Sequence, residues 1–185
     1  MGASHAQCSA VLRLIEVRRL IFLAALASAA LAAGAAALAA APYALVGREA
    51  PDFGLHAVVG SNVRLSEYRG EVVVLSFWGS RCSPCRTQLA ALDKSLRTYQ
   101  SAGLRVFGIN VDDDQGHALE FAKSQSVGFP LLLDPQKTVS RRYGIDNLPM
   151  TLLVDRSGIV RYAHRDYSGK EDTLYLNELR ALLNE

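Results

Sequence analysis

Cysteine is scarce in this sequence of 185 residues, which contains three: Cys8, Cys82 and Cys85. A closed structural zinc site needs about four ligands, and Cys8 lies far from the other two, before a long apolar segment. We therefore expect no bound metal and no other cofactor. The chain also lacks internal repeats, a glycine-rich phosphate loop and a nucleophile-serine motif, which argues against the enzyme classes that depend on them.

Net charge is also low. The formal charge is +2, and four arginines with two glutamates in residues 1–50 account for all of it. Residues 51–185 are therefore neutral overall. A neutral domain without a basic stripe gives no support to nucleic-acid binding.

Charged residues are absent from residues 20–41, which are almost wholly Leu, Ile, Phe, Ala and Gly. Twenty-two such residues are long enough to span the hydrocarbon core of a bilayer. Arg13, Arg18 and Arg19 precede them, so the positive-inside rule puts the N-terminus in the cytoplasm and the rest of the chain outside. A cleaved signal peptide is the alternative, because Ala37-Leu38-Ala39 is an acceptable cleavage site.

These observations divide the chain into four parts. Residues 1–19 are a short cytoplasmic basic segment, and residues 20–41 are a transmembrane signal-anchor or the core of a signal peptide. Residues 42–50 are a linker. Residues 51–185 are long enough for one globular domain of ordinary size.

The most informative stretch of that domain contains Cys82-Ser83-Pro84-Cys85. Residues 72–78 ahead of it form an apolar, β-branched run typical of a buried strand. Beyond Cys82 the sequence changes to helical spacing, with one face made of Cys85, Leu89, Leu92, Leu96 and Tyr99. Cys82 is therefore expected at the start of a helix and Cys85 one turn further in. Pro84 suits an early helical position, where its missing N–H loses no bond.

This placement has chemical consequences for the two thiols. A free thiol titrates at about 8.5, but the unpaired N–H groups and dipole of a helix N-terminus favour the thiolate, and such cysteines reach roughly 3.5 to 7.5. Arg81 and Arg86 flank the pair and act in the same direction if they point toward it. Cys82 is expected to be the attacking thiolate, and Cys85 the more buried thiol that closes the disulfide and releases the substrate. A purely structural disulfide is the alternative.

The rest of the domain alternates strands and helices. Strands are expected at residues 53–58, 63–65, 104–111, 130–133, 151–154 and 159–164, and helices at residues 117–125, 136–143 and 171–183. This order predicts an α/β sandwich with a mixed central sheet. In the last helix we expect Leu174, Leu176, Leu179, Leu182 and Leu183 to be buried.

Two groups of polar residues could suggest metal binding. Asp112, Asp113 and Asp114 lie at the entrance to the helix of residues 117–125, where acidic side chains satisfy unpaired N–H groups and the dipole. Capping is therefore the better interpretation. The histidines His56, His117 and His164 are scattered, and we interpret them as surface or satisfied side chains.

Several short motifs of residues 50–185 share their pattern with one known family. They are Ala50-Pro51-Asp52-Phe53, Leu65-Ser66-Glu67-Tyr68-Arg69-Gly70, Phe77-Trp78-Gly79 before the cysteines, Phe129-Pro130, Leu133-Asp134, Tyr143-Gly144-Ile145 and Leu148-Pro149-Met150-Thr151. Together they resemble the TlpA/ResA type of membrane-anchored periplasmic thiol:disulfide reductases in the thioredoxin superfamily. The resemblance implies a thioredoxin-like fold, with a mixed sheet flanked by helices and an N-terminal β-hairpin extension.

The resemblance also implies roles for individual residues. Cys82 is the nucleophile and Cys85 the resolving thiol of a redox-active disulfide. Leu148-Pro149 is a cis peptide facing that disulfide, and these two residues form the substrate-docking edge. Trp78 packs beside the active-site helix, and we assign it to substrate binding as well. Arg81, also assigned to substrate binding, departs from the family: it replaces the tryptophan that usually precedes the first cysteine and makes the docking surface more basic. Three further residues modulate the active site: Ser83, Pro84 and Gln88.

Two further positions depart from the family pattern. Thioredoxin-like proteins often bury a carboxylate near the second cysteine, either six residues before the first cysteine or three residues after the second. Here these positions are Ser76 and Gln88, and neither can change charge. We therefore expect Cys85 to lose its proton through water or to the mixed-disulfide partner, and resolution to be slow.

The family suggests a protein-disulfide reductase in an oxidising compartment, most simply a bacterial periplasm. Its electrons would come from a membrane thiol donor, and its clients would be disulfide-bearing proteins of the apocytochrome c or copper-site type. Two alternatives stay open. A peroxiredoxin-like peroxidase needs a threonine three residues before its cysteine, where this chain has Gly79. A Sco-like copper chaperone needs Cys-x-x-x-Cys and a distal histidine, for which His164 is a loose candidate.

Overall fold

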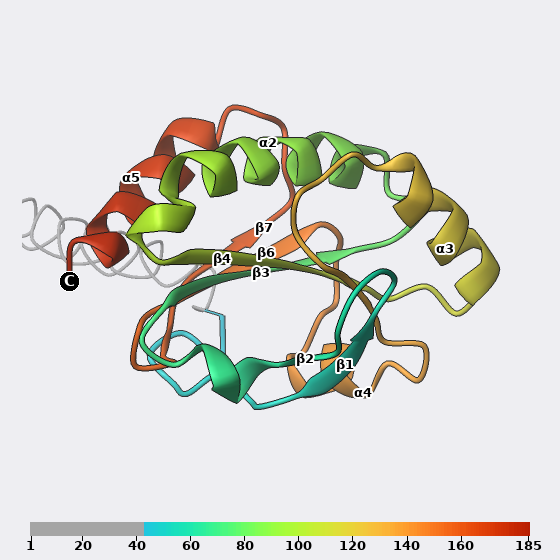
Figure 1. Cartoon of the computed structure of the whole chain (residues 1–185), viewed down its shortest axis with the longest axis horizontal. Helices are drawn as coiled ribbons and strands as arrows, with labels where there is room; N and C mark the ends of the chain where they lie inside the picture. The colour runs from blue at the N-terminus through green and yellow to red at the C-terminus, as the bar shows by residue number, and fades with distance from the viewer. Residues whose placement is uncertain (1–42) are drawn as a thin grey trace, which may run out of the picture. The chain divides into compact units, whose positions relative to one another are not determined.

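The apolar run ahead of the cysteines forms the central strand of the fold. It is β3 (Val72–Trp78), with the bounds predicted from the sequence, and all of its residues are buried. In the computed structural model, which describes residues 43–185, β3 lies within a mixed sheet (Figure 1). The strands of these residues follow the order β2 (Val63–Arg64), β1 (Gly54–Ala57), β5 (Leu131–Leu133), β4 (Leu104–Asn110), β3, β6 (Met150–Val154) and β7 (Val160–Arg165).

The sheet is mixed, as predicted. β3 runs parallel to β4, and β4 runs parallel to β5. The remaining pairs, β1 with β2, β1 with β5, β3 with β6, and β6 with β7, are antiparallel. The strand before the cysteines is therefore paired along both edges and holds its last residue, Trp78, in a fixed position.

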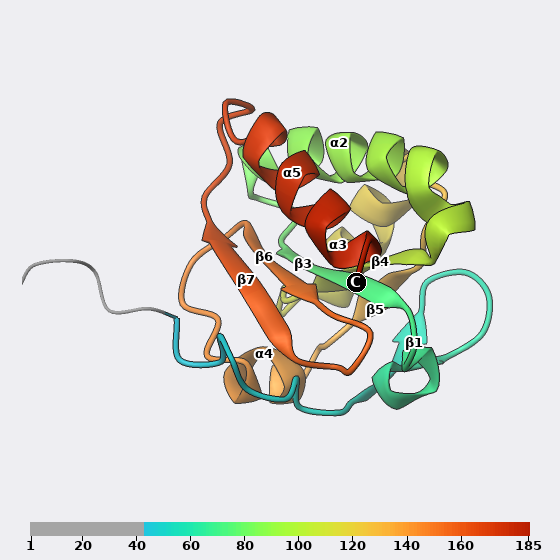
Figure 2. The same ribbon diagram turned by 90° about the vertical axis from the view of Figure 1, so that its left-hand side faces the viewer.

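Helices cover both faces of this sheet. On one face lie α2 (Ser83–Tyr99), α3 (Gln115–Ser124) and α5 (Asp172–Leu183), with α2 and α5 side by side (Figures 1 and 2). On the other face lie α4 (Thr138–Arg142) and the short 3-10 helix η2 (Leu65–Tyr68). A second 3-10 turn, η3 (Gln100–Ala102), continues α2.

The two faces of the sheet bury separate apolar cores. Alternate residues of β3 point to opposite faces, because side chains alternate along a strand. Val73, Leu75 and Phe77 pack against α4 and η2, while Val72, Val74 and Trp78 pack beneath α2, α3 and α5. The second core includes Cys85 and therefore joins the active-site helix directly to the sheet.

One expectation about a helix face is wrong, and one about a helix cap is only partly right. Leu174 was expected to be buried, but it is half exposed, and the first buried side chain of α5 is Tyr175. The capping expectation holds only for Asp114, whose Oδ1 accepts the N–H groups of Gly116 and His117 at the start of α3. Asp113 instead forms an ion pair with Lys137, and Asp112 bonds elsewhere.

The predicted cytoplasmic segment and the predicted anchor or signal sequence, residues 1–41, lie outside the described residues. Among residues 43–185, no helix is both long enough and apolar enough to cross a membrane.

Candidate active site

The two cysteines lie where β3 gives way to α2. Cys82 is the N-cap residue of α2, with extended backbone, and Cys85 lies in the first helical turn. The two form a disulfide, with their Cα atoms 5.3 Å apart. Cys82 is partly exposed, whereas Cys85 is 0% exposed. Only the first sulfur is therefore accessible to another protein.

The start of α2 is electrostatically suited to a thiolate. Its first turn carries no acidic residue, and the Cys82 side chain makes no capping hydrogen bond. The positive end of the helix dipole is thus left to act on the Cys82 sulfur. Pro84 occupies an early helical position, as predicted, and both Ser83 and Pro84 are exposed.

The two arginines beside the cysteines differ in their surroundings. Arg81 is exposed next to Cys82. The Arg86 guanidinium lies 4.7 Å from the centroid of the Phe121 ring in α3, and that ring stacks on Trp78 at 4.9 Å. Arg86 is therefore engaged with α3, and Arg81 is the cation left at the mouth of the site.

Trp78 supports the site from beneath. Its side chain is fully buried in the core under α2 and offers no surface to a client protein in this structure. A Cβ placed on Gly108 of β4 would lie 3.1 Å from Trp78 Nε1, so the neighbouring strand depends on a glycine to leave room for the indole.

The Leu148–Pro149 peptide is cis, as the resemblance implied. Leu148 is half-buried and packs at the edge of the same core as Cys82. A Cβ on Gly79 would lie 3.1 Å from Leu148 Cδ1, so this leucine rests directly against the turn that precedes Cys82. The Pro149 carbonyl accepts the Asp166 N–H at 3.0 Å, which ties the loop to the end of β7.

Sequence reasoning missed the role of Asp112. Its Oδ2 accepts the Ser80 N–H and the Asn110 Nδ2, both at 2.8 Å, and its own N–H donates to Asn110 Oδ1 at 3.0 Å. These bonds join the end of β4 to the turn before Cys82. A groove of about 350 Å³ opens beside this turn, and its lining includes Ser80, Arg81, Asp112, His117, Lys137 and Leu148.

Behind Cys85 the site is polar but carries no charge. Gln88 is 1% exposed, and its Oε1 accepts the Ser76 hydroxyl at 3.1 Å. These two departures from the family pattern are therefore in direct contact. Among the described residues, no group of three His, Cys, Asp or Glu side chains is arranged to hold a metal ion.

A disulfide at the start of a long helix on a mixed sheet, with a cis-proline loop packed against the turn that precedes it, defines a thioredoxin-like redox protein. The family model described as AhpC/TSA matches residues 46–163. Since this is more than half of the sequence, the chain belongs to the AhpC/TSA family.

Two relatives with more than 30% identity share one name. The "Thiol-disulfide oxidoreductase ResA" of Geobacillus thermodenitrificans is 35% identical over 127 residues, which cover 69% of this chain and 73% of the relative. The protein of the same name from Bacillus subtilis is 32% identical over 114 residues, or 62% of this chain and 64% of the relative.

Solved structures agree with this family. One is titled a thiol:disulfide interchange protein DsbE from Chlorobium tepidum, with a TM-score of 0.72 and 31% identity, covering 75% of this chain and 97% of that one. Another, titled a protein disulfide isomerase from Bacteroides thetaiotaomicron, has a TM-score of 0.69 and 30% identity, with coverages of 76% and 91%.

Proposed function

We propose that this protein is a thiol-disulfide oxidoreductase that reduces disulfides in client proteins, with Cys82 as nucleophile and Cys85 as resolving thiol. The observation that carries the proposal is the Cys82–Cys85 disulfide at the start of α2, with one sulfur accessible and the other fully buried. Thiol-disulfide exchange depends on access to the attacking sulfur, and Cys82 is the sulfur of this pair that a client can reach.

The reaction proceeds through two exchanges. In the reduced protein, the Cys82 thiolate attacks one sulfur of a client disulfide, so that a Cys82–client bond forms and the first client thiolate leaves. The Cys85 thiolate then attacks Cys82 Sγ, which restores the Cys82–Cys85 disulfide and releases the second client thiolate. Two electrons pass to the client, and a donor dithiol returns them to the cysteine pair by the reverse exchanges.

The client meets the exposed edge of this site. Leu148 and Pro149 form its docking edge, and Arg81 contributes a cation beside Cys82. Ser83 and Pro84, exposed between the cysteines, adjust the redox properties of the pair, and Gln88 adjusts the surroundings of Cys85. Trp78 acts from below, because it is the fully buried last residue of β3 and packs in the same core as Cys85.

We propose a cellular setting from the sequence. Residues 20–41 anchor the chain in a bacterial inner membrane, residues 1–19 face the cytoplasm, and residues 42–50 link the anchor to a periplasmic redox domain of residues 51–185. If the leader is cleaved, the same domain is released into the periplasm. Electrons come from a membrane thiol donor, and the clients are of the apocytochrome c or copper-site type.

The structure offers no support for the other two functions. Gly79 lies where a peroxidase needs threonine, and a Cβ there would approach Asp112 Oδ1 at 3.0 Å and Leu148 Cδ1 at 3.1 Å. His164, the loose candidate for a copper ligand, has its Nε2 bonded to Glu178. We propose that β1 and β2, which pair antiparallel, form the N-terminal β-hairpin extension that the family resemblance implies.

The two cysteines make the proposal testable. The full-length reduced protein should convert a client disulfide to thiols stoichiometrically. Cys82→Ser should abolish the reaction, because no accessible nucleophile is left. Cys85→Ser should accumulate a covalent complex with the client, visible by mass spectrometry and lost on adding a thiol. If Cys82→Ser reduced the client as fast as the parent, the proposal would be wrong.

A further inference from the structure

A row of polar side chains crosses the sheet beneath α2 and α5, on the face that carries the second apolar core. Ser76 of β3 pairs with Thr151 of β6, and Thr151 pairs with His164 of β7. Residues opposite each other in antiparallel strands point to the same face, with Cβ atoms about 4.5–5.5 Å apart. Ser76 and Thr151 are fully buried. The row therefore runs from the interior to β7, at one edge of the described sheet.

Side chains from the two helices complete this row. Gln88 of α2 bonds Ser76 at one end. At the other end the Tyr175 ring lies 4.2 Å from the His164 ring, and His164 Nε2 lies 2.5 Å from Glu178 Oε2. Gln88 and Tyr175 line the same cavity between α2 and α5, so the two ends of the row meet there. We call these side chains the polar cluster: Ser76, Gln88, Thr151, His164, Tyr175 and Glu178.

The polar cluster holds most of the unpaired buried polar atoms of the described residues. Four buried side-chain nitrogen or oxygen atoms of residues 43–185 have no hydrogen-bond partner, and three of them are Gln88 Nε2, Thr151 Oγ1 and the Tyr175 hydroxyl. Buried polar groups are nearly always satisfied by protein or by ordered water. Three such atoms together therefore indicate a site for ordered water.

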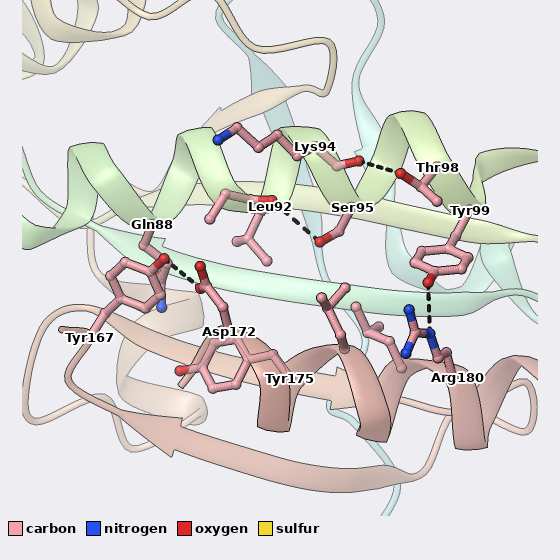
Figure 3. Close-up of a pocket in the computed structure, with 13 residues that line it drawn as sticks. Gln88, Leu92, Lys94, Ser95, Thr98, Tyr99, Tyr167, Asp172, Tyr175 and Arg180 are labelled. Atoms are coloured by element: carbon pink, nitrogen blue, oxygen red, sulfur yellow. Dashed lines mark hydrogen bonds between the residues drawn. The ribbon is translucent and has the colours of Figure 1, made fainter. Parts of the chain in front are cut away.

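A cavity beside the polar cluster gives that water a route. It measures about 280 Å³ and lies between α2 and α5. Figure 3 shows Gln88, Tyr167, Asp172 and Tyr175 gathered at one end of it, with Tyr99 and Arg180 at the other. The polar cluster is thus connected to solvent between the two helices.

Cys85 needs such a connection. Its sulfur is 0% exposed, so the proton of its thiol cannot pass directly to bulk water. Residues three apart on a helix are neighbours on the same face, which puts Gln88 next to Cys85. Neither Gln88 nor Ser76 can accept the proton by changing charge. The titratable pair of the polar cluster is His164 with Glu178, whose side chains are each 14% exposed.

We propose that the His164–Glu178 pair accepts the proton of Cys85, through the polar cluster and its water, when Cys85 resolves the mixed disulfide. The inference rests on the proposed function. The Cys85 S–H proton passes to cluster water, and His164 takes up a proton from that water. The resulting thiolate attacks Cys82 Sγ, the Cys82–client bond breaks, and the client thiolate leaves with the electron pair. Because both act only through intervening groups, His164 and Glu178 are positioning residues.

Other ionisable groups lie around Tyr175 and the cavity. Glu171 and Asp172 act electrostatically on the Tyr175 hydroxyl, and the Tyr167 ring lies 6.2 Å from the Tyr175 ring. Lys94, Tyr99 and Arg180 line the cavity, and Tyr162 of β7 packs against the same core. Burial raises the pKa of both Tyr175 and Tyr167 above the ordinary tyrosine value. Their hydroxyls therefore stay neutral and can bond water, but they take no proton from a thiol. Histidine is the side chain that ordinarily changes charge near neutral pH.

The test separates the two exchanges on the full-length protein. Reduced protein is mixed with an aromatic disulfide whose two thiols are coloured when released, and the release is followed by stopped flow from acidic to alkaline pH. The first phase reports attack by Cys82 and the second reports resolution by Cys85. His164→Gln keeps a side chain able to bond Glu178 but unable to change charge. We expect its second phase to slow by at least about tenfold at roughly pH 6.

Three comparisons make the result decisive. At alkaline pH the second phase of His164→Gln should rejoin that of the parent, because the thiol then ionises without an acceptor. The first phase should be unchanged, and exposed His56, changed to Gln, should behave as the parent throughout. Glu178→Gln should change the pH dependence of the second-phase rate in the same direction. It replaces His164→Gln in the experiment if His164→Gln does not fold. Superimposable second phases at every pH would overturn the inference, whereas a parent without a second phase would refute the proposed function itself.

Discussion

At the scale of single residues, the immediate surroundings of Cys85 determine how the protein resolves a mixed disulfide. Gln88 and Ser76 occupy the two positions where the family resemblance implies a carboxylate, and the structure joins them by a hydrogen bond of 3.1 Å. A buried amide and hydroxyl can orient water but cannot hold a proton. Slow resolution by Cys85 is therefore the expected property of this site.

Replacing Gln88 by Glu tests this view. A carboxylate buried at this position has its pKa raised by desolvation, which makes it a suitable proton acceptor near neutral pH. We expect the second phase of the stopped-flow reaction to accelerate by about tenfold or more at neutral pH. The first phase should stay the same, because Cys82 is the attacking group there.

Gln100→Glu is the matched control, since Gln100 is exposed at the far end of the same helix. Gln100→Glu adds the same negative charge as Gln88→Glu, but at a position away from Cys85. Equal second phases for the parent and the Gln88→Glu variant would contradict the account of slow resolution.

Some residues of the site could not be predicted from the sequence. The Asp112 bond to the Ser80 N–H joins residues 32 positions apart, and it depends on β4 lying beside β3. The contact of His164 with Glu178 depends on α5 packing over β7. Motif spacing identifies residues near the cysteines, whereas these partners are set by the tertiary arrangement.

At the scale of elements, periodicity predicted where strands and helices lie better than which faces they bury. The bounds of β3 were predicted without error, because a fully buried run of seven residues has a clear start and end. In α5 the leucine pattern pointed to Leu174, but the buried face instead carries Tyr175, Leu179 and Leu182. Tyr175 was overlooked because an amphipathic tyrosine gives a weaker apolar signal than leucine.

The cap of α3 yields a stability prediction with a pH dependence. Hydrogen bonds from the backbone N–H groups of His117 and Gly116, with the nearby His117 charge, lower the pKa of Asp114 below its ordinary value. A depressed folded-state pKa means that the stabilisation is complete above the unfolded-state pKa and is lost as pH falls through the folded-state value. Asp114→Ala should therefore lower the melting temperature by a few degrees at neutral pH.

The difference between Asp114→Ala and the parent should shrink in acid, once the carboxyl of the parent is protonated. Asp113→Ala serves as the control, because Asp113 is exposed and pairs with Lys137 without capping the helix. Thermal unfolding followed by circular dichroism provides the measurement. An equal loss for Asp113→Ala, or a loss for Asp114→Ala that is independent of pH, would contradict this assignment of the cap.

At the scale of the whole molecule, the fold places the reactive sulfur at the surface and its partner in a core. The alternation of strands and helices predicted the α/β class and the mixed sheet. The strand order could not be predicted from periodicity alone, because β1 and β2 join the sheet next to β5, which is far from them along the chain. Of the two apolar cores, the one beneath α2, α3 and α5 includes Cys85 and holds α2, and therefore the disulfide, in place.

The direction of electron flow is a property of the whole molecule, because it depends on the stability of the oxidised protein relative to the reduced one. The central claim is that the protein works as a reductant. The reduction potential of the Cys82/Cys85 pair tests this claim most directly, by equilibrating the full-length protein with thiol–disulfide buffers and measuring the oxidised fraction. The account predicts a value near or below that of thioredoxin, about −270 mV. A value near that of a strong oxidant, about −120 mV, would contradict it and identify a protein that introduces disulfides.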